Sequence, residues 1–340
     1  MSRLAFAFTA EHRAAYAPLG PDVLAAVCFD PQTSDGGLPG LPLIQPGMPT
    51  LDRAASGCEL LRHSGPLEEG QRGTFRYRCG PELLFGASRR PFPEGGSRHD
   101  RLETQIEQLY RELFAVTEEL QYPHVLRVWN YVPNINEAED GLERYRRFSI
   151  GRHNAFAARD QKYRDDPIPA ASAVGTVGTD QTTVYFLAGR HPGRALENPR
   201  QVSAYHYPSA YGPRSPTFSR AMLATLERQE LLLVSGTASI VGHRSQHEGD
   251  VVAQTRESLD NLRAVLTETG RGTAGKPYTL ESLCYKVYVR NPADKDAIEQ
   301  CLRGQVGSAA ALFLRADICR KELLVEIEAA GVRDRSSHAS

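Results

Sequence analysis

The sequence predicts an α+β (α/β) fold built from two similar units, each a mixed sheet with two helices packed on one face. Three features of the chain indicate this fold. Strand-like alternation recurs along it, the segments 99–120 and 250–269 have the pattern of amphipathic helices, and the elements follow the same order in both halves. The 340 residues are 41% hydrophobic, which suffices for a substantial core in each unit.

The first unit is expected to run strand, strand, helix, strand, helix, strand, strand. Its helices are predicted at 99–120 and at about 139–159, and in the former apolar residues recur every three or four positions. Alternating or continuous apolar runs predict its strands at 74–79, 83–88, 124–132, 169–178 and 182–189.

The second unit repeats this order. Its helices are predicted at 250–269 and 294–304, and Asp294 is expected to cap the second of them. Its strands are predicted at 231–238, 283–289, 311–318 and 323–329.

Residues at near-constant separations match between the units. Gly86 and Gly236 are 150 positions apart, and Val184 and Val325 are 141 apart, which aligns Tyr185 with Glu326. A separation of 157 relates Leu126, Tyr131, Val132 and Asn134 to Leu283, Tyr288, Val289 and Asn291. The small changes in separation indicate loop insertions between duplicated units.

These patterns divide the chain into four parts. Residues 1–69 are rich in glycine and proline and are expected to form an N-terminal extension with few long elements, such as a short strand at 24–29. The two units occupy 70–195 and 196–332, and residues 333–340 are expected to be a disordered tail.

Composition argues against several classes of partner. A net charge of −1 gives no global attraction to nucleic acid, and no run approaches the roughly 18 apolar residues of a membrane span. The six cysteines form no CxxC pair, which favours free thiols in a cytoplasmic protein. His243 and His247 lie in a predicted loop without an evident third ligand, so no metal is expected.

The last predicted strand carries carboxylates on one face. Val325 and Ile327 point to one side of it, and Glu326 and Glu328 point to the other. One interpretation is an ordinary edge strand with solvated glutamates. Cys319 lies just upstream, beyond a polar turn.

Three motifs of the second unit resemble those of the Rid (YjgF) family. Ser-Gly-Thr-Ala at 235–238 is similar to that family's Ser-Gly-Gln strand end, the segment 254–261 to its Gln-x-x-x-Ser-Leu-Asp-Asn helix, and Val-Glu-Ile-Glu-Ala at 325–329 to its closing strand. The first unit is similar in layout only. Rid proteins are trimers with a ligand site between subunits. The resemblance therefore implies one such interface inside this duplicated chain, which permits a monomer.

The duplicated chain also resembles the chorismatase family. The resemblance rests on Tyr-His-Tyr-Pro at 205–208, on the segment 211–220, and on Ser-Gly-Thr-Ala-Ser-Ile-Val-Gly-His at 235–243. Members of that family act on chorismate and release pyruvate. The resemblance therefore implies a cofactor-free enzyme with chorismate as its small-molecule substrate.

The resemblance also implies roles for three residues. Glu326 is expected to be the general acid that protonates the enol ether of chorismate, with Glu328 as its rival. Such an acid must be kept protonated by burial or by nearby negative charge. The chorismatases that form 3-hydroxybenzoate are similar to this sequence in having a cysteine seven residues before the acid, here Cys319, and a glycine at the position of Gly236. Cys319 is therefore expected to favour the aromatic product.

Arginines and tyrosines are expected to bind the substrate, because chorismate is a dicarboxylate that a guanidinium group holds with two parallel hydrogen bonds. Arg152 and Arg214 are the predicted clamps, with Arg315 in reserve. The remaining predicted contacts are Tyr145, Tyr211, Gly236 and Thr237.

Three alternatives remain open. A looser cleft that admits water would hydrolyse chorismate to a dihydroxycyclohexadiene carboxylate and pyruvate. A chain without catalytic activity would be a Rid-like module that binds a small carboxylate. Imine hydrolysis, as in the Rid family itself, is less favoured because the duplication and the segment 205–220 go beyond that family.

Overall fold

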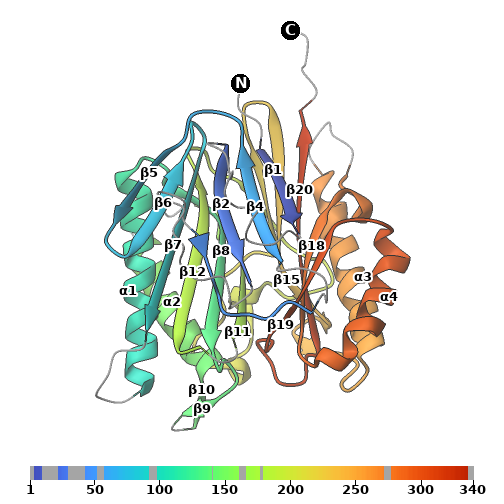
Figure 1. Ribbon diagram of the computed structural model, residues 1–340. Coiled ribbons are helices and arrows are strands. Elements are labelled where there is room, and N and C mark those ends of the chain that lie inside the picture. Colours follow the sequence, from blue (N-terminus) through green and yellow to red (C-terminus); the bar gives the residue numbers. More distant parts are fainter. Residues whose placement is uncertain are drawn as a thin grey trace.

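The structure is a computed structural model that describes residues 4–9, 22–29, 43–51, 57–91, 98–139, 141–160, 166–176, 179–271 and 277–335. Two helix-covered sheets and a smaller N-terminal sheet make up the molecule (Figure 1). None of the helices in these ranges is long and apolar enough to cross a membrane.

The first repeat is a six-stranded sheet in the order β11-β8-β12-β7-β6-β5, with α1 (Arg98–Glu119) and α2 (Arg144–Asp160) on one face. Its strands are β5 (Glu68–Arg72), β6 (Phe75–Cys79), β7 (Leu83–Pro91), β8 (His124–Pro133), β11 (Ala170–Thr176) and β12 (Gln181–Gly189). β11 and β8 are parallel, and the other neighbours are antiparallel.

The second repeat has the order β13-β14-β15-β20-β18-β19, with α3 (Val251–Thr269) and α4 (Lys295–Val306) on one face. Its strands are β13 (Arg194–Leu196), β14 (Ala221–Thr225), β15 (Gln229–Ala238), β18 (Cys284–Val289), β19 (Ala311–Arg315) and β20 (Val325–Asp334). Reversed, this order matches the first repeat strand for strand, including the parallel pair β18 and β19. The predicted fold class and duplication are therefore confirmed.

Short elements connect these strands and helices. Two hairpins are formed by β9 (Ala138–Glu139) with β10 (Leu142–Glu143), and by β16 (Ile240–Val241) with β17 (Arg244–Ser245). Single 3-10 turns lie at Ala204–His206, Ser209–Tyr211, Leu280–Ser282 and Pro292–Asp294. The β9–β10 hairpin occupies the start of the segment predicted as the second helix, so α2 begins five residues later than expected.

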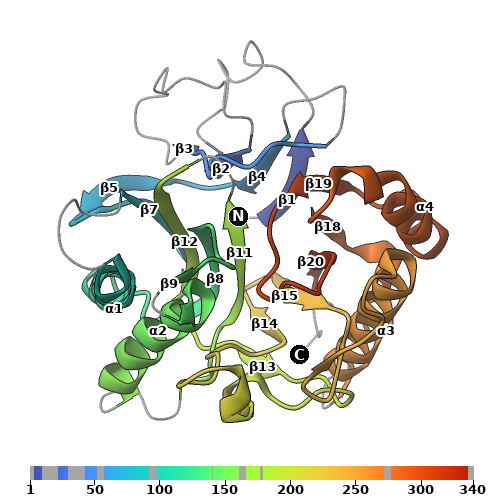
Figure 2. The ribbon, with the colours of Figure 1, turned by 90° about the horizontal axis from the view of Figure 1, so that it is seen from below.

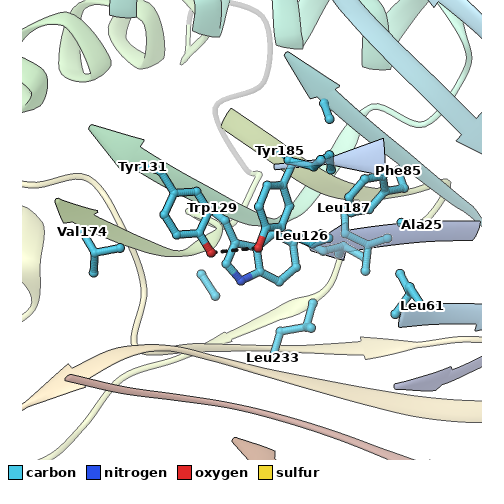
Figure 3. Close-up of a cluster of buried hydrophobic side chains, with 14 of the residues drawn as sticks. Ala25, Leu61, Phe85, Leu126, Trp129, Tyr131, Val174, Tyr185, Leu187 and Leu233 are labelled. Atoms are coloured by element: carbon cyan, nitrogen blue, oxygen red, sulfur yellow. Dashed lines mark hydrogen bonds between the residues drawn. The ribbon is translucent and has the colours of Figure 1, made fainter. Parts of the chain in front are cut away.

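The N-terminal sheet has the order β1-β4-β2-β3, formed by β1 (Leu4–Thr9), β2 (Val23–Cys28), β3 (Leu43–Ile44) and β4 (Cys58–His63). Seen from below, it closes the third side of a triangle whose other sides are the two repeats, and the four helices lie outside (Figure 2). A single cluster of buried side chains fills the interior and draws on all three sheets, as Leu61, Trp129 and Leu233 illustrate (Figure 3).

Equivalent tyrosines of the two repeats meet in this interior. The hydroxyl oxygens of Tyr131 and Tyr288 lie 3.0 Å apart, and the Tyr131 hydroxyl also lies 2.9 Å from that of Tyr185 (Figure 3). Tyr131 pairs across strands with Thr183, and Tyr288 pairs with Glu326. Thr183, and not Tyr185, is thus the counterpart of Glu326. The predicted alignment of Val184 with Val325 is therefore wrong by two residues.

Several expectations need correction. β20 lies between β15 and β18, so it is not an edge strand, and it runs through residue 334, beyond the expected start of the tail; residues 336–340 lie outside the described ranges. Asp294 holds the N-cap position of α4, but its side chain makes no capping bond.

The expectation of free thiols is wrong for one pair of cysteines. Cys28 and Cys58 form a disulfide between β2 and β4. They are directly opposed in the antiparallel register, with Cα atoms 4.2 Å apart. Their separation of 30 residues carries no signal in the sequence, because only the pairing of the strands brings them together.

Candidate active site

The two repeats enclose a pocket of about 900 Å³, counting its open mouth. The first repeat contributes β10, the start of α2 and the middle of β11. The second contributes the segment 201–220, the end of β15, the start of β20 and the loop 316–324, which we call the acid loop because it leads into β20. Backbone hydrogen bonds join Gly175 to Asp317 in both directions and fix the repeats at this point. The lining residues are Glu143, Tyr145, Arg146, Phe148, Ser149, Arg152, Ala171, Ser172, Ala173, Gln201, Tyr207, Tyr211, Pro216, Thr217, Phe218, Arg220, Gly236, Ala238, Ile240, Cys319, Arg320 and Glu326.

Glu326 faces this pocket as a buried acid. Alternation along β20 places Val325 and Ile327 in the core beneath α3 and α4, and it turns Glu326 to the opposite face. Its side chain is 4% exposed and has no hydrogen bond or ion pair with any residue that the structure describes. Burial, followed by the negative charge of Glu328, raises its pKa to about 8, against a lowering effect of Arg127. The carboxyl group is therefore mainly protonated at neutral pH.

Glu328 has the opposite environment. Trp129 Nε1 and the Tyr288 hydroxyl donate to its carboxylate at 2.9 and 2.7 Å, and Arg127 and Lys286 form ion pairs with it. Burial would raise the pKa of Glu328, but Lys286 and Arg127 outweigh burial and lower it to about 2. Glu328 does not line the pocket. A permanently ionised group with four donors is unsuited to proton donation.

Arg152 on α2 is a buried cation without a counter-ion. It is 3% exposed, and its Nε and Nη2 atoms have no hydrogen-bond partner among the described residues. Its guanidinium carbon lies 5.2 Å from the centre of the Tyr110 ring and 5.5 Å from that of Phe156. Because uncompensated buried donors are costly, these atoms mark a place for an anion at the pocket wall.

Two further arginines of the lining are held in place by neighbouring groups. Arg220 donates from Nη2 to the Val202 carbonyl and the Tyr207 hydroxyl, both at 2.9 Å. Arg320 stacks 4.1 Å above the Tyr211 ring and donates to the carbonyl of His243 at 3.0 Å. These contacts fix both side chains before any ligand arrives, which lowers the entropic cost of binding.

Neutral hydroxyl and thiol groups lie beside the acid. Burial raises the pKa of the Tyr145 hydroxyl well above its usual value, and Cys319 and Glu326 are among the groups that raise it further. Burial, followed by Glu326, raises the pKa of Cys319 to about 12. Cys319 is therefore a protonated thiol at neutral pH, unsuited to nucleophilic attack. Tyr211 shares a hydrogen bond of 3.1 Å with His243 Nδ1.

Gly236 makes room for the acid. It lies in a bulge of β15, where the pairing register with β20 shifts between Val234 and Thr237. A Cβ atom at Gly236 would collide with Oε1 of Glu326 and lie 2.7 Å from its carboxyl carbon. Only glycine accommodates the observed position of this carboxyl group.

The structure brings six of the eight expected site residues together. Glu326, Cys319, Arg152, Tyr145, Tyr211 and Gly236 line the pocket. Arg214 is exposed and lies outside the lining, and the reserve candidate Arg315 is exposed on β19. Thr237 is buried, and its hydroxyl donates to the Ser235 carbonyl instead of facing the pocket.

Sequence reasoning missed several residues of the site. Arg220 and Arg320 lie in segments already singled out, but nothing distinguishes them there from Arg214. Lys286 lies on β18, and the register of β18 with β20 brings it near the acid. Arg127 lies on β8 of the first repeat, and only the packing of the two sheets brings it there. A cation within a strand that is otherwise apolar is the one signal that could have identified these two.

No metal site is evident within the described ranges. No group of three or more His, Cys, Asp or Glu side chains there is placed to hold an ion. His243 and His247 have separate partners, since His247 lies 3.4 Å from Glu257.

The fold and the pocket together define a protein that binds an anionic small molecule next to a neutral, buried carboxylic acid. Comparisons with known proteins narrow this class. A family model described as chorismatase FkbO/Hyg5-like, N-terminal, matches residues 59–188. A 3-hydroxybenzoate synthase of Streptomyces hygroscopicus is 36% identical over 326 residues, which is 92% of this chain and 92% of that protein. A chorismatase of Streptomyces rapamycinicus is 38% identical over 80% of this chain and 81% of its own length.

A solved structure agrees with these relatives. The crystal structure of a chorismatase superposes with a TM-score of 0.84 at 32% identity, and the match covers 97% of this chain and 98% of the other. The chain belongs to the chorismatase family, and the resemblance expected from its motifs is confirmed.

Proposed function

We propose that this protein converts chorismate to 3-hydroxybenzoate and pyruvate, with Glu326 as the general acid. The observation that carries the proposal is a buried carboxyl group with a pKa of about 8 facing an arginine-lined pocket. An acid protonated at neutral pH, beside cations that bind carboxylates, is what protonation of a dianionic enol ether requires.

Charge matching supports chorismate as the ligand. Four arginines line the pocket, Arg146, Arg152, Arg220 and Arg320, against one other acidic residue, Glu143. One carboxylate of chorismate would pair above all with Arg152, whose Nε and Nη2 have no partner among the described residues. Arg220 and Arg320 replace Arg214 as candidates for the second clamp.

The first chemical step is proton transfer to carbon. Glu326 gives its proton to the terminal methylene of the enolpyruvyl group, which becomes a methyl group, and positive charge develops at the ether carbon. The Tyr145 hydroxyl, kept neutral by its raised pKa, is available to donate a hydrogen bond beside the reacting groups.

The second step sets the product. The ring hydroxyl next to the ether attacks the ring carbon that bears the enolpyruvyl oxygen. That carbon–oxygen bond breaks, pyruvate leaves, and the hydroxyl proton restores Glu326. The epoxide then opens at its other carbon–oxygen bond, so that the oxygen stays on the carbon that bore the enolpyruvyl group. The oxygen takes up a proton and the ring loses one, which gives 3-hydroxybenzoate. Chorismic acid thus yields 3-hydroxybenzoic and pyruvic acids without any added water.

Cys319 and Gly236 favour this internal route by excluding water from the reacting carbon. The protonated Cys319 thiol fills space beside Glu326 as a small apolar group. Gly236 lets the carboxyl group sit close against β15. The site is complete within one chain, so a monomer suffices for activity.

Incubation of the purified protein with chorismate tests the proposal. Pyruvate is measured by its reduction with lactate dehydrogenase, and the ring product is identified by mass spectrometry. Equimolar pyruvate and 3-hydroxybenzoate are expected. A non-aromatic diene acid would show the hydrolytic alternative, and binding of chorismate without pyruvate release would show a carboxylate-binding module.

Two substitutions test the choice of product. Cys319→Ala opens space for water, and Gly236→Ala displaces the Glu326 carboxyl group, so both are expected to raise the share of diene acid. Cys301→Ala and Gly304→Ala on α4 are matched controls outside the pocket, and they should leave the ratio unchanged. An unchanged ratio in both test variants would contradict the assigned roles.

A further inference from the structure

A buried ion network lies outside the pocket, where the three sheets meet. It joins Glu59 of β4, Arg127 of β8, Lys286 of β18 and Glu328 of β20. The four residues are between 1% and 7% exposed. Glu59 is the only member from the N-terminal sheet, and it lies outside the pocket lining.

The contacts within the network are direct. Lys286 Nζ lies 2.9 Å from Glu59 and 3.3 Å from Glu328, and it donates to the Tyr185 hydroxyl at 3.1 Å. Arg127 Nη2 lies 3.2 Å from Glu328. Trp129 packs against both cations, since the centre of its ring lies 5.0 Å from the Arg127 guanidinium carbon and 5.2 Å from Lys286 Nζ. Because all four charged residues are buried, water screens these charges little.

The charges of the network cancel. Arg127 and Lys286 are two cations, and Glu59 and Glu328 are two anions. Glu326 lies next to this network, on the same face of β20 as Glu328, and would be a third anion with no cation of the network left to neutralise it. A third charge in this low-dielectric region is costly, so the neutral acid is favoured.

We propose that Glu59 is a positioning residue for the reaction: by pairing with Lys286 it completes a neutral buried network, and this neutrality holds Glu326 in its protonated form. The N-terminal sheet thereby takes part in the chemistry without touching the substrate. The inference rests on the proposed role of Glu326 as general acid.

Other titratable and charged groups also face Glu326. Glu328, Arg127, Tyr145 and Cys319 are coupled to its charge. The other charged groups of the pocket wall are Glu143, Arg146, Arg152, Arg220 and Arg320. Bound chorismate would pair with the wall arginines, whereas no member of the buried network lines the pocket.

The direction of the pKa shifts agrees with this account. Burial would lower the pKa of Lys286, but Glu328 and Glu59 outweigh burial and raise it, so Lys286 stays charged. Among the effects on Glu326, Glu328 raises its pKa and Arg127 lowers it. Removing one anion from the network leaves a net positive charge, which must favour ionised Glu326.

The test is the pH dependence of kcat/KM for pyruvate release, which reports ionisations of the free enzyme. In Glu59→Gln, the basic limb is expected to move toward lower pH by about one unit, so that activity well above the limb falls about tenfold. In Glu59→Gln/Lys286→Met the network is neutral again, and the limb should return to its wild-type position. Glu230→Gln, which breaks the Glu230–Arg333 ion pair at the far end of β15, should leave the limb in place.

A second readout separates this inference from the proposed function. Infrared difference spectra between the wild type and Glu326→Gln follow the protonated carboxyl band of Glu326 directly, without turnover. The band is expected to titrate near pH 8 and to titrate lower in Glu59→Gln. Glu328→Gln removes an anion that acts on Glu326 directly, and it is the positive control for both readouts. Where Glu59→Gln alone does not fold, Glu59→Gln/Lys286→Met is compared with Lys286→Met, in which the limb and the band should lie at higher pH because that network carries a net negative charge.

The outcomes are distinct. If the band shifts as expected but no pyruvate forms from chorismate, the proposed function fails and the network still controls Glu326. If pyruvate forms but neither the limb nor the band moves in Glu59→Gln, while both move in Glu328→Gln, the role of Glu59 is refuted. If the losses of activity add up in Glu59→Gln/Lys286→Met and its limb does not return to the wild-type position, Glu59 acts only in folding.

Discussion

Two glutamates two residues apart on one strand differ in charge because of their neighbours alone. Glu328 receives hydrogen bonds from Trp129 and Tyr288 and pairs with Lys286, whereas Glu326 receives none of these. The alternation of β20 predicts that both share a face, and this is confirmed. The sequence could not show which one is neutral, because the cations come from other strands.

The raised pKa of Glu326 has a measurable cost in stability. Folded protein keeps a proton on Glu326 up to about pH 8, while the unfolded chain loses it near pH 4.5. The free energy of unfolding contributed by this group therefore falls as pH rises between these values, by about 1.4 kcal/mol per pH unit. Glu326→Gln removes this penalty, so at pH 7 the variant should be more stable by roughly 3 kcal/mol. Denaturant melts at pH 4.5 and pH 7 check this, and an equal gain at both would contradict it.

Arg152 is expected to favour substrate binding while it lowers the stability of the fold. Arg152→Met removes a buried cation with unpaired donors, so the free energy of unfolding should rise by roughly 1–3 kcal/mol. The KM for chorismate should rise about 100-fold because a charged clamp is lost. Arg147→Met on the same helix is the control, because Arg147 is paired with Glu103, and that variant should be less stable. A destabilised Arg152→Met variant would show that Arg152 supports the fold.

At the scale of elements, the acid loop (316–324) is held by one arginine, Arg290, which directly follows β18. Arg290 donates to the carbonyls of Ile318, Arg320 and Leu323 at 2.8–3.1 Å and pairs with Asp317 at 2.7 Å. Gln254 of α3 holds the end of the loop, through the Glu322 carbonyl and the Leu324 amide. The motif that carries the family resemblance thus anchors the loop before the acid.

Arg290→Met should loosen the acid loop. Three carbonyl groups lose their donor, and the free energy of unfolding is expected to fall by roughly 3 kcal/mol or more. Because Cys319 and Arg320 lie in this loop, KM should rise and the share of diene acid should increase. Thermal melts and product analysis measure both effects. A stable variant with an unchanged product ratio would contradict the assigned role of Arg290.

Helices with a clear periodicity of apolar residues were predictable from the sequence, whereas features that depend on tertiary contacts were not. The spacing of apolar residues located α1 and α3 within a residue or two, because the helical face that packs on a sheet must be apolar. The start of α2 was wrong because residues 138–143 form a hairpin with no distinctive pattern. Arg214 was a predicted clamp and Arg220 was not, but Arg220 is the one that lines the pocket. Side-chain direction decides this, and the sequence does not reveal it.

At the scale of the whole molecule, the N-terminal part proves to be a third wall of the interior. Its glycine- and proline-rich sequence predicted few elements, yet β1, β2 and β4 pack on both repeats through Leu4, Leu24 and Leu61 respectively. The duplicated units form two sides of the triangle in Figure 2, and this sheet supplies the third. Such packing between sheets leaves no short-range signal in the chain.

The disulfide of this sheet should stabilise the whole molecule. Cys28 and Cys58 close a loop of 30 residues, and opening it is expected to cost about 3–4 kcal/mol in the free energy of unfolding. Melting temperatures with and without a phosphine reductant measure this effect, and Cys28→Ser/Cys58→Ser is the control that should no longer respond. A wild-type melting temperature insensitive to reductant would contradict it.

The central claim is that the neutral carboxyl group of Glu326 protonates the substrate. The most direct test is pyruvate release by Glu326→Gln at pH 7, with binding of chorismate measured by calorimetry on the same sample. The account predicts that turnover falls by at least about 1,000-fold, at the level of a lost general acid, while chorismate still binds. A variant that turns over chorismate within tenfold of the wild type would contradict it.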